Sequence, residues 1–516
     1  MHSKKIPALL IFIILIIFLG TSTAGTTVPS SEIVLIPLDS RPCNTDYIMY
    51  AAGALDKKLS YPKDFIDNYN QPSRQDNLYK FLYDSLDTAD TYIIFTNQII
   101  NGGLIASRDP LSYIGIEEKI NDFTNFLELA KEYDKQVFVV SVLPRVIPSQ
   151  FTDLWNFRDE LISFSNQFGS IDLDVFQNAY QSPPKEIIAK YLSIYSGSDL
   201  IVNQMKDSVD KGLIDLFIIG QDDTYKESIT NHQINKYLQY NNEKIIVQPG
   251  ADELTKLILA KIIRNETSNY PLDINLKYTD TSESKEIRAY EGTSTEKRAD
   301  QILQFLNIKN NNSSENVAII HNKAGTSETS INSIYNNVNK KYLSLIDIAY
   351  INRGDPELFI EPSFLKNLNG YSGWNTVGNS LGSEFANFVI YDFLGKNLSS
   401  YTQEKQVEIL ENYYKLFYIH FSDDYLYQGI LRNQLNSYLI SEKENTSFIS
   451  NKVAADKFLQ QMFQNESVIL DASLSGAYNA FGSVFHIKYE PANISLPWKR
   501  TFEARIIPNL TITKGR

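Results

Sequence analysis

The chain has few of the residues that build disulfides and histidine-rich metal sites. It contains one cysteine, Cys43, and five histidines in 516 residues. A lone cysteine cannot form an internal disulfide, so the fold must be stabilised by its hydrophobic core. No HExxH motif or clustered histidine pair occurs, which disfavours a histidine-rich zinc site. Neither GxGxxG nor GxxxxGK[ST] occurs, so the usual nucleotide-phosphate motifs are missing.

Basic residues are also in the minority. There are 48 lysines and arginines against 61 aspartates and glutamates, a formal net charge of −13. Nucleic-acid phosphates would be repelled by such a surface, so we expect no nucleic-acid partner. At 43% hydrophobic and 12% aromatic residues, the composition excludes a disordered chain.

The N-terminus has the pattern of a secretory signal. Lys4 and Lys5 precede an apolar run from Ile6 to Leu19 and a run of small and polar residues, and cleavage is expected after Ala24. We therefore predict a signal peptide at residues 1–24 and a secreted or extracytoplasmic protein. The alternative is a retained membrane anchor, but such a span normally needs roughly 20 apolar residues.

Short β-branched apolar runs alternate with helical patterns through the first three quarters of the chain. The predicted strands are Ile33–Leu38, Tyr92–Phe95, Val137–Val142, Leu213–Ile219, Lys244–Val247, Val317–Ile320 and Ile346–Ile351. Predicted helices between them include 116–133, 252–264 and 296–306. This alternation predicts an α/β fold with a parallel sheet covered by helices, either doubly wound or barrel-like.

The pattern changes near residue 397. We expect an α/β domain over residues 31–397, a helical segment over 398–466, and a C-terminal β region over 467–516 that packs on the main domain.

Polar residues follow every predicted strand. The strand exits are PLDSRPCN (37–44), NGGLIASR (101–108), LPR (143–145), GQDD (220–223), PGADE (249–253), HNK (321–323) and NRGDPE (352–357). The carboxyl ends of parallel strands share one edge of a sheet, and ligand sites form at that edge. The sequence therefore predicts one site built from several strand ends. Within it, Gly102 and Gly103 are expected to allow a close backbone approach.

Several of these motifs, together with YSGWNTVGNSLG (371–382) and LPWKRTFE (496–503), resemble those of a mainly bacterial family known as domain of unknown function 4127. The resemblance covers residues 33–503, with the motifs in the family's order. One departure is Ser40, where the family more often has an aspartate before its Arg-Pro pair. The resemblance implies no established reaction, so the chemistry has to be inferred from the residues.

Carboxylates at the strand ends are the candidate catalytic groups, namely Asp39, Asp222, Asp223 and Glu253. The alternative for the paired acids is capping of the following helices. The candidate substrate-binding residues are Arg41, Asn44, Asn101, Ser107, Arg108, Asp252, Asn352, Asp355, Trp374, Asn375 and Asn379. A flat indole beside amides suits stacking on a sugar ring while its hydroxyls are hydrogen bonded.

We therefore expect an exported hydrolase that acts on a carbohydrate or cell-wall glycan through two carboxylates, with no cofactor. One alternative is a hydrolase that depends on a divalent metal held by Asp39, Asp222, Asp223 and Asp355. Another is a non-catalytic sugar-binding protein of the cell surface.

Three further patterns leave alternatives open. Arg41 either pairs with Asp39 in the scaffold or holds a ligand, and we favour the ligand because Pro42 can direct the loop outward. A GxSxG motif centred on Ser380, with Asp424 and His486 downstream in the order of a hydrolase triad, suggests a serine hydrolase, but a poor strand precedes it. His420 and Asp424 are four residues apart and are expected as an exposed helix pair.

Overall fold

The computed structural model describes residues 32–167, 183–240, 242–267, 270–325, 331, 334–336, 341–358 and 362–515. The expected signal peptide at residues 1–24 lies outside them. Within the described residues, no helix is both long and apolar enough to span a membrane.

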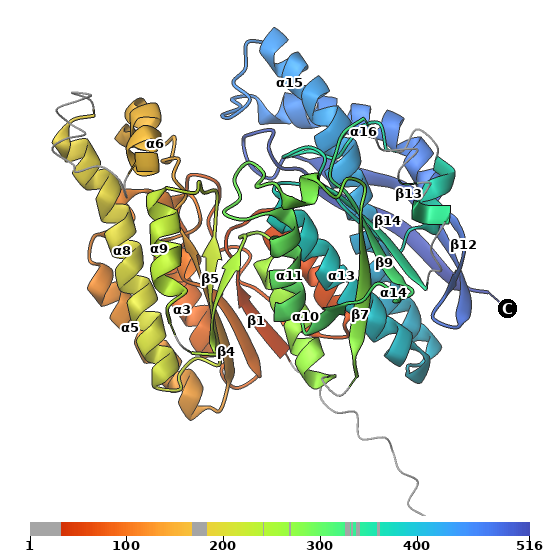
Figure 1. Cartoon of the computed structure of the whole chain (residues 1–516), viewed down its shortest axis with the longest axis horizontal. Helices are drawn as coiled ribbons and strands as arrows, with labels where there is room; N and C mark the ends of the chain where they lie inside the picture. The colour runs from red at the N-terminus through yellow and green to blue at the C-terminus, as the bar shows by residue number, and fades with distance from the viewer. Residues whose placement is uncertain are drawn as a thin grey trace, which may run out of the picture.

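Two separate parallel sheets are present where the sequence predicted one (Figure 1). The first has the order β2-β1-β3-β4-β5-β6 and the second the order β11-β10-β9-β7-β8. The first sheet comprises β1 (Glu32–Ile36), β2 (Lys58–Ser60), β3 (Thr91–Phe95), β4 (Gln136–Leu143), β5 (Leu216–Gln221) and β6 (Ile245–Pro249). The second comprises β7 (Leu272–Tyr278), β8 (Ile308–Asn310), β9 (Asn316–His321), β10 (Tyr342–Asp347) and β11 (Gly370–Ser372). Each sheet has two different edge strands, so both are open and neither is a barrel.

Helices cover both faces of the first sheet. One face carries α3 (Gln75–Asp84), α5 (Ile116–Glu132), α8 (Lys185–Asp210) and α9 (Ile229–Tyr237). The other face packs on α2 (Asp46–Ala54) and α10 (Leu254–Glu266), and its hydrophobic core continues without a break into the second sheet, α11 (Thr295–Phe305) and α13 (Val377–Asn397). Below, residues 32–267 are called the first lobe and 270–397 the second lobe.

The chain then forms the predicted helical segment and a small antiparallel sheet. The helices are α14 (Gln403–His420), a π-helix (Phe421–Leu431), α15 (Arg432–Ser441) and α16 (Lys452–Leu474). The sheet has the order β12-β13-β14, with β12 (Gly476–Ala480), β13 (Ser483–Ser495) and β14 (Arg505–Lys514). The α/β class, the helical segment and the C-terminal β sheet predicted from the sequence are therefore confirmed.

Two predicted boundaries are wrong for physical reasons. The β region was expected from Ser467, yet α16 continues to Leu474 because Phe463, Ser467, Leu470 and Leu474 repeat at helical spacing and are buried. The last predicted strand, Ile346–Ile351, begins too late: β10 spans Tyr342–Asp347, so only its last two residues were recognised.

Candidate functional site

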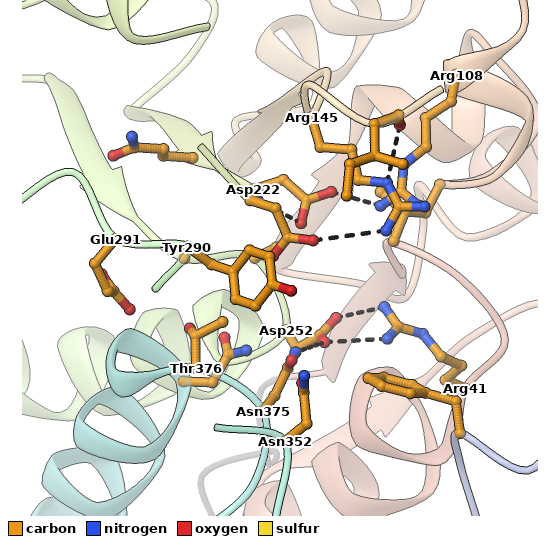
Figure 2. Close-up of a pocket in the computed structure, with 18 of the residues that line it drawn as sticks. Arg41, Arg108, Arg145, Asp222, Asp252, Tyr290, Glu291, Asn352, Asn375 and Thr376 are labelled. Atoms are coloured by element: carbon orange, nitrogen blue, oxygen red, sulfur yellow. Dashed lines mark hydrogen bonds and ion pairs between the residues drawn. The ribbon is translucent and has the colours of Figure 1, made fainter. Parts of the chain in front are cut away.

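The carboxyl ends of both sheets meet at a polar cavity of about 230 Å³, called here the central cavity. The first lobe lines it with Arg41, Leu104, Arg108, Arg145, Ile147, Gln221, Asp222, Asp223, Gly250, Ala251 and Asp252. The second lobe contributes Tyr290, Glu291, Arg298, Asn352, Asn375, Thr376 and Asn379, and Phe502 completes the lining. Figure 2 shows these side chains converging from both lobes. Strand-end loops therefore create one site, as the sequence predicted, but from two sheets.

Arg41 forms the centre of a buried ion-pair cluster. Its Nε and Nη2 donate to Asp39 Oδ2 at 2.9 and 2.6 Å, and its Nη1 and Nη2 donate to Asp252 at 3.1 and 2.5 Å. Asn44 Nδ2 donates to both carboxylates. Arg41 is 4% exposed, so it is the scaffold partner of Asp39 and also of Asp252. Of the two alternatives for Arg41, pairing with Asp39 in the scaffold is therefore the arrangement that the structure contains.

Asp222 and Asp223 follow β5 and have different electrostatic surroundings. Burial alone would raise the pKa of Asp222, but the guanidinium groups of Arg108 and Arg145 outweigh burial and lower it. Arg108 Nη2 donates to Asp222 Oδ2 at 2.5 Å. Burial, together with the charge of Asp222, raises the pKa of Asp223 to about 6. Near neutral pH one carboxylate of this pair therefore stays ionised while the other can carry a proton.

The second lobe adds amides held by backbone geometry. Asn352 and Asn375 have φ angles of 62° and 71°, a left-handed conformation that asparagine tolerates better than most residues. Asn352 N–H donates to the Asn375 carbonyl at 2.9 Å, and Asn375 Nδ2 donates to Asp252 Oδ2 at 3.1 Å. The two asparagines thus fix each other and connect the second lobe to the Arg41 cluster.

Glu291 joins the N-terminus of α13 to a buried arginine. It accepts from Gly378 N–H at 2.8 Å and from Arg298 Nε at 2.9 Å. An anion at a helix N-terminus is stabilised by the unpaired N–H groups there. This pair holds Thr376, the N-cap residue of α13, and Asn379, in its first turn, at the cavity.

The C-terminal segment Trp498–Glu503, called here the closing segment, covers the Arg41 side of the cavity. The Trp498 ring stacks on Tyr69 with centroids 5.2 Å apart, and the Arg41 guanidinium lies 5.6 Å from the Trp498 ring centroid. Trp498 Nε1 donates to Ser40 Oγ, and Phe502 lines the cavity. This segment therefore ties the end of the chain to the first strand exit.

The central cavity contains eight of the fifteen candidate residues: Arg41, Arg108, Asp222, Asp223, Asp252, Asn352, Asn375 and Asn379. Asp39 and Asn44 lie behind its wall, fully buried in the Arg41 cluster. Asn101 and Ser107 bond within their own loop, to Ser112 and to the Leu104 carbonyl, and so support Arg108 indirectly.

Three other candidates do not line the central cavity. Asp355 pairs with His321 Nε2 at 2.9 Å, away from the cavity. Glu253 and Trp374 line a chamber of about 30 Å³ behind Asp252. Burial, together with the neighbouring charge of Asp252, raises the pKa of Glu253 there to about 8.

The same chamber contains a buried chain of polar side chains. Asp424 Oδ2 lies 3.0 Å from His420 Nδ1, and His420 Nε2 lies 3.0 Å from Lys256 Nζ. The expected exposed pair of His420 and Asp424 is therefore wrong, because His420 at the end of α14 and Asp424 in the π-helix are both buried. Ser380 Oγ donates to the Trp374 carbonyl, and His486 lies on an exposed position of β13. A Ser380–His486–Asp424 triad is thus not formed.

The sequence did not identify several lining residues as candidates. Arg145 and Gln221 stand in strand exits that were recognised, LPR and GQDD, without being assigned a role. Tyr290, Glu291 and Arg298 follow β7, a strand that was not predicted. Asp273 and Lys277 interrupt the apolar residues of β7, so the sequence has no continuous apolar run that would predict this strand.

Among the residues that the structure describes, no group of three or more His, Cys, Asp or Glu side chains is arranged to hold a metal ion. Three of the cavity carboxylates, Asp222, Asp252 and Glu291, are instead closely paired with arginines, which compete with a cation for the same oxygens.

The fold and cavity define a two-lobed α/β protein whose parallel sheets direct their carboxyl ends at one polar site. The chain belongs to the family described as "Protein of unknown function (DUF4127)", whose model matches residues 33–507. No curated protein matches the chain. Among solved structures, a GDP-L-fucose synthetase from Naegleria fowleri bound to NADP is similar at 11% identity and a TM-score of 0.22, covering 72% of this chain and 94% of that one.

Proposed function

We propose that the protein is an exported hydrolase that acts on a carbohydrate bound in the central cavity, with Asp223 as the proton donor. The observation that carries this proposal is the adjacent pair Asp222 and Asp223 on the wall of a small polar cavity. Amides of Asn352, Asn375 and Asn379 supply both donors and acceptors for sugar hydroxyls.

The two carboxylates are suited to different steps. Asp223 makes no close hydrogen bond through its carboxyl oxygens to a cation, and its nearest ion-pair contact, Arg145 Nη1, is 3.6 Å away. It can therefore hold a proton and donate it to the leaving glycosidic oxygen. Asp222 is kept ionised by Arg108 and can act as the base or nucleophile. Asp39 and Glu253 have no place in this scheme, because neither lines the cavity.

The pH profile follows from these assignments. A general acid works only while protonated, so activity should fall as pH rises above about 6, the raised pKa of Asp223. It should also fall in more acidic solution as Asp222 becomes protonated, because its pKa lies below the ordinary value.

The test uses the chain from residue 25 onward against a panel of glycans and chromogenic glycosides, with and without chelator. Asp223→Asn should lower kcat by about 100-fold or more and leave sugar affinity nearly unchanged. The matched control is Asp84→Asn, an exposed carboxylate in a surface ion pair with Lys80, which should change neither quantity.

Three other results would contradict the proposal. Full activity in Asp223→Asn would show that Asp223 is not the proton donor. Loss of activity on chelation would favour the metal-dependent alternative. Sugar binding without turnover of any substrate would favour the sugar-binding protein. Export is tested separately, by sequencing the N-terminus of the protein recovered outside the cytoplasm of its host.

A further inference from the structure

Arg145 differs from the other three arginines of the central cavity. Arg41, Arg108 and Arg298 each donate hydrogen bonds of 2.5 to 3.1 Å to carboxylates. Arg145 donates its Nε to the Ile147 carbonyl at 3.1 Å, which fixes the guanidinium plane. Its ion pair with Asp223 Oδ2 spans 3.6 Å, longer than a hydrogen bond. Both Nη groups of Arg145 are therefore available at the cavity.

The charge of Arg145 is also incompletely balanced. Its side chain is only 25% exposed, and burial together with the neighbouring charge of Arg108 lowers its pKa to about 10. Two guanidinium groups that repel each other at a cavity wall would both be stabilised by a bound anion.

Unused hydrogen-bond donors outnumber unused acceptors around this cavity. Among the described lining side chains, the buried donors Arg108 Nε, Gln221 Nε2 and Arg298 Nη1 have no partner, whereas Asn379 Oδ1 is the one such acceptor. All four side chains are at least nine-tenths buried. Donors therefore predominate over acceptors in the cavity wall, as expected beside a ligand rich in acceptor oxygens, whereas a neutral sugar presents hydroxyls that donate as well as accept.

We infer that the carbohydrate bound here is an acidic sugar whose carboxylate is held by both Nη groups of Arg145, with Arg108 beside it. This inference rests on the proposed function and specifies its substrate class. A guanidinium fork matches a carboxylate in a bidentate geometry. A phosphate matches it too, but its charge of about −1.5 to −2 would meet stronger repulsion from Asp222, Asp223 and Asp252. A singly charged carboxylate suits this lining better.

The test compares ligands that differ in one group. Binding of D-galacturonate and D-glucuronate is measured by calorimetry beside D-galactose, D-glucose and glucose 1-phosphate. The uronates should bind about 10- to 100-fold more tightly than the parent sugars, because charge-assisted hydrogen bonds contribute a binding free energy of that size. That preference should diminish as salt is raised.

Variants then assign the preference to Arg145. Arg145→Gln should abolish the uronate preference and leave the affinity for neutral sugars unchanged, while Arg145→Lys, which keeps the charge but loses the fork, should retain part of it. Arg158→Gln, at an exposed arginine beside Asp159, is the matched control and should behave as wild type. Thermal unfolding of each variant shows whether the fold is retained. If Arg145→Gln does not fold, the uronate preference of Arg145→Lys is compared with that of the wild type instead.

The outcomes separate this inference from the proposed function. Equal affinity for uronates and neutral sugars, or an uronate preference that survives Arg145→Gln, would overturn the inference and leave the carbohydrate site standing. Tighter binding of glucose 1-phosphate than of either uronate would overturn the assignment of a carboxylate. Binding of none of the sugars would contradict the proposed function itself.

Discussion

Replacing Arg41 with lysine tests how the two walls of the first lobe are held together. The arginine donates four side-chain hydrogen bonds, two to Asp39 and two to Asp252, from a position that is 4% exposed. Lysine keeps the positive charge but cannot span both carboxylates with a planar fork. The carboxylate that loses the guanidinium would then keep only uncharged partners: Asp39 the Asn44 amide and the backbone N–H of residue 41, or Asp252 the amides of Asn44 and Asn375.

The expected loss of stability can be worked out from these contacts. Removing one partner of a buried ion pair costs about 3–5 kcal/mol, and retention of the charge places Arg41→Lys near the lower limit, at about 3 kcal/mol. The chain after Ala24 has 492 residues (516 minus 24). At about 2.1 cal/mol/K per residue, its unfolding entropy is about 1 kcal/mol/K, so the melting temperature should fall by about 3 °C if the chain unfolds as one unit.

Equilibrium unfolding in urea measures this loss directly, with calorimetry as the second readout. Arg158→Lys changes an exposed arginine in the same way and should alter the free energy of unfolding by less than about 0.5 kcal/mol. If Arg41→Lys were as stable as the wild type while sugar binding disappeared, the scaffold role would be refuted. Arg41 would then be a ligand-binding residue, as we favoured from the sequence.

Two further predictions concern backbone strain and buried acids. Gly103 has a φ of 125° and a Cβ there would lie 2.7 Å from Asp67 Cβ, so Gly103→Ala should cost about 2–4 kcal/mol in urea unfolding. Gly212→Ala, at φ 73° with open space around it, should cost only about 1 kcal/mol, and equal losses would refute the close approach. Burial and the charge of Asp424 raise the pKa of Asp423 to about 8, so the folded protein binds the extra proton between about pH 4 and 8 and loses stability as pH rises through that range. Asp423→Asn should therefore gain about 2 kcal/mol or more relative to wild type between pH 5 and pH 9, and a constant difference across that range would contradict the raised pKa.

The sequence was informative about the first lobe because its strands are continuous apolar runs. Runs such as Ile93-Ile94-Phe95 and Val137–Val142 are buried on both faces and therefore lack polar alternation. Their order along the chain implies parallel pairing, and parallel pairing places the polar exits at one edge. The positions of Asp222, Asp252 and Arg108 at a shared cavity follow from that reasoning.

The second lobe was less predictable because its short strands carry weaker signals. β8 and β11 have three residues each, and β7 mixes Asp273 and Lys277 with its apolar residues. Without β7, nothing in the sequence showed that the strands after it form a sheet of their own. The pairing of Glu291 with Arg298 and its contact with the N-terminus of α13 depend on that sheet, so neither residue was a candidate.

Side-chain partners that are distant in the sequence could not be predicted either. Arg41 was weighed against Asp39, two residues away, because local pairs are visible in a sequence. Asp252, its second partner, lies 211 residues further along the chain. Local spacing cannot reveal such a contact, and the same holds for Tyr69 and Trp498.

The closing segment makes the central cavity depend on the order in which the chain is synthesised. Tyr69 leaves the ribosome 429 residues (498 minus 69) before its stacking partner Trp498. At about 5–20 residues per second, this interval lasts roughly 20–90 s. During that time the first lobe can assemble around Arg41 and Asp39 while one wall of its cavity has not yet been made. A nascent chain that contains both lobes but not yet the closing segment thus has no complete site, and synthesis of that segment completes it.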